Sequence, residues 1–146
     1  MAAKRKRSLQ ATLAALALAV VYAGLVGEWP VGAPVDSDEA RIEQAFRERR
    51  GDLWVEVVGE VRKTLPDDRD GSRHQRFILA LETGRTLLVA HNIDLADRVP
   101  LARGDRVRLR GEYEWNEQGG VLHWTHHDPQ GRHEGGWIEV SGRRYR

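Results

Sequence analysis

Several segments between residues 53 and 125 alternate apolar and polar side chains with a period of two, and this pattern restricts the fold more than any other feature. The alternation places successive side chains on opposite faces, so it predicts strands that each bury one face. The expected strands are residues 53–63, 74–82, 85–91, 105–115 and 121–125. A meander, a connection and a final hairpin follow the order of an OB fold. We therefore predict a mostly β protein in which residues 52–146 form a small five-stranded OB-like barrel. A small open sheet with a helix across one face is the alternative.

The first 27 residues have the composition of an export signal. Lys4 to Arg7 are all basic, and Leu9 to Val26 is apolar with few exceptions. The apolar length lies between that of a signal peptide and that of a minimal membrane-spanning helix. Val21–Ala23 would serve as a cleavage site, whereas Trp29 would anchor a retained helix at the membrane interface. Residues 1–27 are therefore expected to be a signal peptide or a membrane anchor, with the membrane as a partner if they are retained.

A linker and one short helix are expected between this segment and the strands. Residues 28–35 contain two prolines and a glycine, as linkers do. Asp36 or Ser37 would cap a helix over residues 36–51 that ends at Gly51. Its narrow apolar stripe is expected to pack against one end of the β domain. This stripe consists of Ala40, Ile42, Ala45 and Phe46.

Composition limits the chemistry that the domain can perform. The chain has no cysteine, which excludes disulfides, thiolate metal sites and a cysteine nucleophile. From Ser8 onward the chain carries 19 basic against 22 acidic residues, because four of the 23 Lys and Arg lie in the N-terminal tail. A small or polymeric anionic ligand is compatible with this balance. Nucleic acid is not favoured by it, since non-specific binding normally needs a basic excess.

Four short motifs give the second half of the chain a distinctive pattern. They are RHQRF at 73–77, HNIDL at 91–95, GEYEWN at 111–116 and HWTHHDP at 123–129. Through these motifs, Arg73 to Tyr145 resembles an uncharacterised bacterial family of exported small proteins, a domain of unknown function. The resemblance implies a shared architecture and a bacterial origin. Together with the N-terminal segment, it places the domain in the periplasm or cell envelope, anchored in the inner membrane or secreted.

The second and third strands are expected to bring polar side chains together. If Thr83–Gly84 is a two-residue hairpin loop, Arg76 faces His91, and His74 shares their face. Ile78, Leu87 and Val89 then lie further along this face. The opposite face would be the core side, with Phe77, Leu79, Leu81, Leu88 and Ala90.

The fourth and fifth strands add further candidates. Val107, Leu109, Tyr113 and Trp115 are expected to point inward. A four-residue turn would place His123 opposite Glu114 on the outer face, whereas a slip of one residue would bury His123. The candidate catalytic residues are therefore His74, Arg76, His91, Glu114 and His123.

Histidines are concentrated near the C-terminus, and this suggests a metal site. Four of the six histidines lie between His123 and His133, beside a carboxylate, and this donor set suits zinc or manganese. The alternative is a turn that only reverses the chain, since adjacent histidines on a strand point to opposite faces. The candidate metal ligands are His91, His126, His127, Asp128 and His133.

Two functions remain open. One is a metal-assisted or histidine-based hydrolase of phosphodiesters, in which Arg76 stabilises the developing negative charge. The other is a non-catalytic OB-type binding module for an oligosaccharide, a peptide or nucleic acid. Four tryptophans could stack on bases or sugars, although most are expected to lie in the core: Trp54, Trp115, Trp124 and Trp137. Catalysis requires the histidines and Arg76 to converge in one cleft, whereas a binding module does not.

Overall fold

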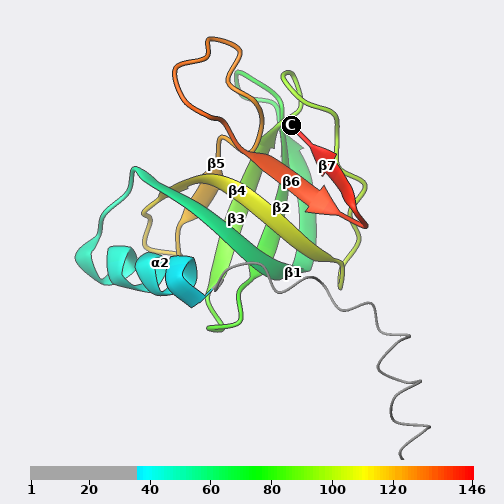
Figure 1. The fold of residues 1–146 in the computed structure, drawn as a ribbon. Helices are drawn as coiled ribbons and strands as arrows, with labels where there is room; N and C mark the ends of the chain where they lie inside the picture. The colour runs from blue at the N-terminus through cyan, green and yellow to red at the C-terminus, as the bar shows by residue number, and fades with distance from the viewer. Residues whose placement is uncertain (1–35) are drawn as a thin grey trace, which may run out of the picture. The chain divides into compact units, whose positions relative to one another are not determined.

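The structure is a computed structural model that describes residues 36–146. The predicted signal or anchor (1–27) and the linker (28–35) lie outside the described residues. Within the described part of the chain, no helix has the length and apolar character needed to span a membrane. The described residues form one helix, α2 (Asp36–Glu48), and a seven-stranded sheet (Figure 1). The strands are β1 (Leu53–Asp68), β2 (His74–Ala80), β3 (Thr86–Asn92), β4 (Arg106–Glu114), β5 (Val121–His123), β6 (Trp137–Val140) and β7 (Arg143–Tyr145).

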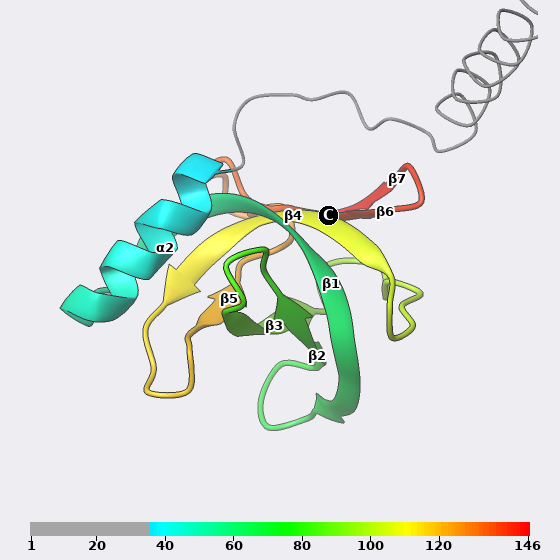
Figure 2. The ribbon, with the colours of Figure 1, turned by 90° about the horizontal axis from the view of Figure 1, so that it is seen from below.

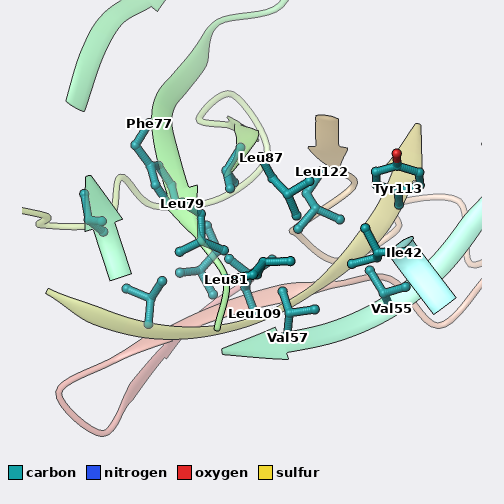
Figure 3. Packing of buried hydrophobic residues seen from close by; sticks show 14 of the residues in the cluster. Ile42, Val55, Val57, Phe77, Leu79, Leu81, Leu87, Leu109, Tyr113 and Leu122 are labelled. Carbon is teal, nitrogen blue, oxygen red and sulfur yellow. The ribbon is translucent and has the colours of Figure 1, made fainter. Parts of the chain in front are cut away.

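Helix α2 covers one end of the sheet, as its apolar stripe predicts. Ile42 and Ala45 are almost completely buried in the core, and Figure 3 shows Ile42 beside Val55 and Tyr113. The helix ends three residues before Gly51, because Arg49 adopts the left-handed conformation with φ of 54°. The Arg50 N–H then donates to the Ala45 carbonyl at 2.9 Å, which closes the last turn.

Carboxylates on α2 fix the helix to the β2–β3 loop. Glu39 is buried and accepts hydrogen bonds from the backbone N–H groups of Glu82 and Thr83, at 3.4 and 3.1 Å. Glu43 accepts two bonds from Arg85, at 2.6 and 2.7 Å. This bidentate ion pair lowers the pKa of Glu43. The helix is therefore held by polar contacts as well as by its apolar face.

Five of the strands close a ring (Figure 2). Antiparallel pairs join β1 to β2, β2 to β3, β5 to β4 and β4 to β1, and a parallel pair joins β3 to β5. The meander and the β3–β5 pairing are confirmed by this order. The long strand β1 makes it possible, because Leu53–Glu60 pairs with β4 and Glu60–Asp68 pairs with β2.

A short hairpin, β6–β7, extends the sheet beyond the ring and was not predicted. Strand β6 pairs with β4 at Arg108–Arg110, and β7 pairs with β6. Ile138, Val140 and Tyr145 are buried and alternate with more exposed neighbours. The alternation of apolar and polar residues was therefore present in the sequence. Strands of four and three residues are, however, too short to be identified from this periodicity.

The interior of the ring is filled by the inward faces of its strands (Figure 3). The predicted faces of β2 and β4 are confirmed, because Phe77, Leu79, Leu109 and Tyr113 are completely buried. Other fully or almost fully buried members of this core are Val55, Val57, Leu87, Val89 and Leu122.

The predicted face of β3 is wrong, because the hairpin turn between Leu81 and Arg85 contains three residues instead of two. Leu81 N–H donates to the Arg85 carbonyl at 2.9 Å, and Gly84 N–H donates to the Leu81 carbonyl at 3.0 Å. Gly84 has φ of 87°, as a type I turn with a following bulge requires. The extra residue shifts the register by one and exchanges the two faces of β3.

The exchange moves His91 from the outer face into the core. Arg76 now pairs with Ala90, and Gln75 pairs with His91. Leu87, Val89 and His91 point inward, whereas Leu88 and Ala90 are half-buried on the outer face.

The β4–β5 loop is two residues longer than the predicted turn. His123 therefore pairs with Glu112 instead of Glu114, and Val121 takes the place opposite Glu114. A shift of two keeps the faces, so His123 remains outside as predicted. The last residues of the loop must be glycine, since Gly120 has φ of 112° and a Cβ there would lie 2.1 Å from the Tyr113 ring.

Candidate functional site

Three potential metal ligands meet on the outer face of the ring, where β4 pairs with β5. Glu112 and Glu114 are two residues apart on β4 and share one face, and His123 lies opposite Glu112. One carboxylate oxygen from each glutamate and one ring nitrogen of His123 all lie within 4.8 Å of one another. All three side chains are half-buried. We call these residues the Glu–His cluster.

The backbone around the cluster holds the glutamates in place. The Asp52 N–H donates to Glu114 Oε1 at 3.2 Å. A Cβ on Gly51 would lie 2.0 Å from Glu114 Oε2, so glycine at this position makes room for the carboxylate. Glu112 lies between two neighbouring strands, with Trp54 of β1 on one side and His123 of β5 on the other. The helix–strand junction and three strands therefore position the donors.

The electrostatics of the cluster favour a positive charge between the donors. Two carboxylates at this distance repel each other, and partial burial strengthens the repulsion. His123 Nε2 lies 3.3 Å from Glu112 Oε2, but this buried nitrogen makes no hydrogen bond. Buried polar atoms rarely lack a partner. In the described part of the chain only one other buried side-chain atom does so, Arg110 Nε, two residues before Glu112.

Arg110 borders the cluster on the same face of β4. One of its terminal nitrogens donates to Glu134 at 2.8 Å, and its guanidinium carbon lies 5.6 Å from the centre of the Trp54 ring. Its Nε is buried and has no hydrogen-bond partner, whereas the side chain as a whole is partly exposed at the edge of the cluster.

His91 lies apart from this cluster, in the interior of the ring. Nε2 lies 3.1 Å from the Asp97 carbonyl, which can only accept, so Nε2 carries the proton. Nδ1 then accepts from the Thr125 hydroxyl at 2.9 Å. The side chain is fully buried, and burial lowers its pKa, so the ring is neutral near pH 7. Both nitrogens are occupied, and His91 therefore connects two loops and has no free donor for a metal.

His74 and Arg76 do not reach the cluster either. Both lie on β2, and β3 separates β2 from β5. His74 Nδ1 lies 2.8 Å from the Ser72 carbonyl, and Arg76 Nε donates to the Pro66 carbonyl at 3.0 Å. The bond to Pro66 directs the guanidinium toward β1, on the side of β2 that faces away from His123.

The proposed metal ligands near the C-terminus lie in the long β5–β6 loop, drawn in orange in Figure 1. His126 is buried, and its Nδ1 donates to the His127 carbonyl at 2.7 Å. Burial lowers the pKa of His126. His127 is exposed. Among the described residues, His91, His126, His127, Asp128 and His133 do not gather around one point.

Asp128 and His133 are neighbours, but Asp128 has a structural role. Its carboxylate accepts hydrogen bonds from the backbone N–H groups of Gln130, Arg132 and His133, at 2.9, 2.6 and 3.2 Å. These bonds lower the pKa of Asp128, and the one from the Gln130 N–H has the largest effect. Asp128 therefore shapes the turn that the sequence predicts around Pro129.

The sequence analysis missed Glu112 and Arg110 as site residues. Both alternate along the fourth strand with Leu109 and Tyr113, which are expected to point inward, and both lie on the outer face. The assumed four-residue turn placed Glu114 opposite His123, and this left Glu112 without a role. Glu112 and Glu114 are two residues apart on one strand, and His123 lies on the next strand along the chain. This spacing was the sequence signal that could have identified Glu112.

The fold and the cluster define a small β domain with a ring of five strands and a carboxylate–histidine site on its outer face. The chain belongs to the family described as Protein of unknown function (DUF3465), which it matches over residues 26–146. The match extends well beyond the motif region that begins at Arg73. No curated protein matches the chain.

Proposed function

We propose that this protein is an OB-type barrel that binds a divalent cation through Glu112, Glu114 and His123, and that the cation serves the hydrolysis of phosphodiesters. The pairing order of the five-strand ring supports the barrel. The observation that carries the proposal is the approach of the three donor atoms to within 4.8 Å of one another.

The donor set suits zinc or manganese. Carboxylate oxygen and imidazole nitrogen are ligands of both ions, and the chain has no thiolate that would compete. A cation between the glutamates would remove their repulsion and would give His123 Nε2 its missing partner. Three protein ligands leave coordination positions open, which is the pattern of catalytic sites.

Arg110 supports an anionic substrate at this site. It lies two residues before Glu112 on the same strand face, at a spacing of about 7 Å along the strand. Its side chain is partly exposed, and its guanidinium would donate to a phosphate oxygen. A bound divalent cation supplies a water molecule of lowered pKa. Arg110 would stabilise the charge that develops on the phosphoryl oxygens, the role that the sequence suggested for Arg76.

A second function, a non-catalytic OB-type binding module, is favoured by one observation. Catalysis by the predicted histidines would require their side chains to meet in one cleft. His91, however, is buried in the core, and His74 lies on β2. Such a module would still bind the cation and would not hydrolyse a phosphodiester.

We also propose that the domain works in the bacterial periplasm or cell envelope, anchored in the inner membrane or secreted. The basic residues Lys4 to Arg7 followed by an apolar segment support export.

Calorimetric titration of zinc and manganese into the tag-free protein tests the cation site. We expect one bound ion per chain in the wild type. Glu112→Gln and Glu114→Gln should each lower the affinity at least about tenfold, since even outer-shell changes have effects of this size. Glu117→Gln is the matched control, because Glu117 is exposed in the β4–β5 loop. Equal binding by all four proteins, or binding by none, would refute the site.

Hydrolysis is tested separately, with bis(p-nitrophenyl) phosphate in the presence and absence of a chelator. Activity that the chelator removes, and that Glu112→Gln lacks, supports the hydrolase. Cation binding with no turnover would refute the hydrolase and leave the binding module.

A further inference from the structure

Three half-buried tryptophans reach one region of the outer surface, outside the Glu–His cluster. Trp54 is on β1, Trp137 is on β6, and β4 runs between them. Trp124 follows β5. Most tryptophans were expected in the core, yet none of the four in the described residues is fully buried. Large aromatic side chains on a surface commonly mark a recognition site.

One histidine joins two of the rings, arginines flank the third, and Trp137 lies opposite Arg110 across the β4–β6 pair. The His133 ring lies between two of them, with its centre 4.9 Å from that of Trp54 and 4.6 Å from that of Trp124. The guanidinium carbon of Arg108 lies 5.6 Å from the centre of the Trp137 ring, and that of Arg144 lies 3.9 Å from it. We call Trp54, Trp124, Trp137, Arg108, Arg110 and Arg144 the aromatic strip.

The charges of the aromatic strip are neutralised by partners on the same surface. Arg108 pairs with Glu56. Arg110 pairs with Glu134 at 2.8 Å, and Arg144 pairs with Glu139 at 3.0 Å. Nucleic-acid surfaces carry an excess of positive charge, and this strip has none. Each guanidinium has five donors and each carboxylate about four acceptor positions, so the pairs can still bind polar groups of a ligand.

We propose that the aromatic strip binds an uncharged oligosaccharide. The C–H faces of sugar rings stack on indole rings, and their hydroxyl groups match the alternating donors and acceptors of the Arg–Glu pairs. The strip includes none of the three cation ligands, so this binding does not depend on the cation.

The alternative explanation is structural. His133 lies between Trp54 and Trp124 and packs the β5–β6 loop against the sheet. In this explanation the rings only stabilise the fold and bind no ligand. Trp137 separates the two explanations, because it lies on β6 and its ring contacts are with Arg108 and Arg144.

The test uses the full chain with soluble hexasaccharides as probes: cellohexaose, chitohexaose and maltohexaose. Affinity is measured by calorimetry and by tryptophan fluorescence, with a chelator present so that the cation plays no part. We expect at least one probe to bind, and Trp137→Ala to weaken it about tenfold, within the range of a lost aromatic stacking contact. Arg144→Ala should weaken it less, because only polar contacts are lost.

Trp115→Ala is the matched control, since Trp115 lies off the strip and donates its ring N–H to the Phe46 carbonyl of α2 at 3.2 Å. Circular dichroism establishes that each variant is folded. If Trp137→Ala does not fold, Arg144→Ala tests the proposal in its place. Failure of all three hexasaccharides to bind at about 10 mM, roughly ten times the Kd of a complex worth only about 4 kcal/mol, overturns the proposal. Equal loss in Trp115→Ala, or binding of single-stranded dT12 in place of the sugars, also overturns it.

Discussion

Replacing Thr125 by valine should destabilise the domain through one buried hydrogen bond. Thr125 is completely buried, and its hydroxyl donates to His91 Nδ1 at 2.9 Å. Valine has almost the same volume, so the change creates no cavity. It leaves a ring nitrogen without a donor in the core, at a cost of about 1–3 kcal/mol. Because His91 also donates to the Asp97 carbonyl, the ring cannot rotate to another partner without losing that bond.

Urea denaturation at pH 7.5, followed by tryptophan fluorescence, measures this free energy of unfolding. Thr125→Val should lower the midpoint and leave the slope with urea unchanged, since the same surface is exposed on unfolding. Thr86→Val is the control, because Thr86 is exposed at the start of β3. Stability of Thr125→Val within about 0.5 kcal/mol of wild type, the scatter of surface substitutions, would refute the account of the His91 network.

Two further predictions concern pH and location. Burial lowers the pKa of His91 and His126, so below their ordinary pKa of about 6.5 the unfolded chain binds more protons than the folded domain. The free energy of unfolding should therefore be level above that pH and fall as the pH drops below it. Thermal melts at pH 7.5, 6.5 and 5.5 measure this dependence. A melting temperature that does not change with pH would contradict the buried, neutral histidines. A reporter enzyme fused after Tyr145 should be active only outside the cytoplasm, because Lys4 to Arg7 remain inside. Cytoplasmic activity of the fusion would contradict export.

The sequence predicts the faces of β2 and β4 correctly because one side of each strand is clearly apolar. In β4, Val107 and Leu109 alternate with arginines, so only one face can be buried. Strand β3 reads Leu87–Leu88–Val89–Ala90, which is apolar on both sides. The hairpin loop alone then sets the register. Loops of two and of three residues both fit a sequence that ends in Gly84, so the choice between them could not be made from the sequence.

The same limit explains how much of the candidate site was predicted. An error of one residue in the β2–β3 loop moved His91 from the predicted site into the core. An error of two residues in the β4–β5 loop preserved the face of His123 and changed only its partner, from Glu114 to Glu112. Periodicity gives the face of a strand, whereas the length of each loop decides which side chains meet across strands.

The two pairings of β1 have a consequence for the order of folding. Its second half pairs with the neighbouring strand β2, so a hairpin can form from adjacent sequence. Its first half can pair only after β4 has formed, since Leu53 pairs with Tyr113. Contacts between residues so far apart in the sequence form slowly. Until β4 arrives, the backbone of Leu53–Glu60 presents an open edge to which another chain could add. The interval before ring closure is therefore when a newly synthesised chain is most exposed to aggregation.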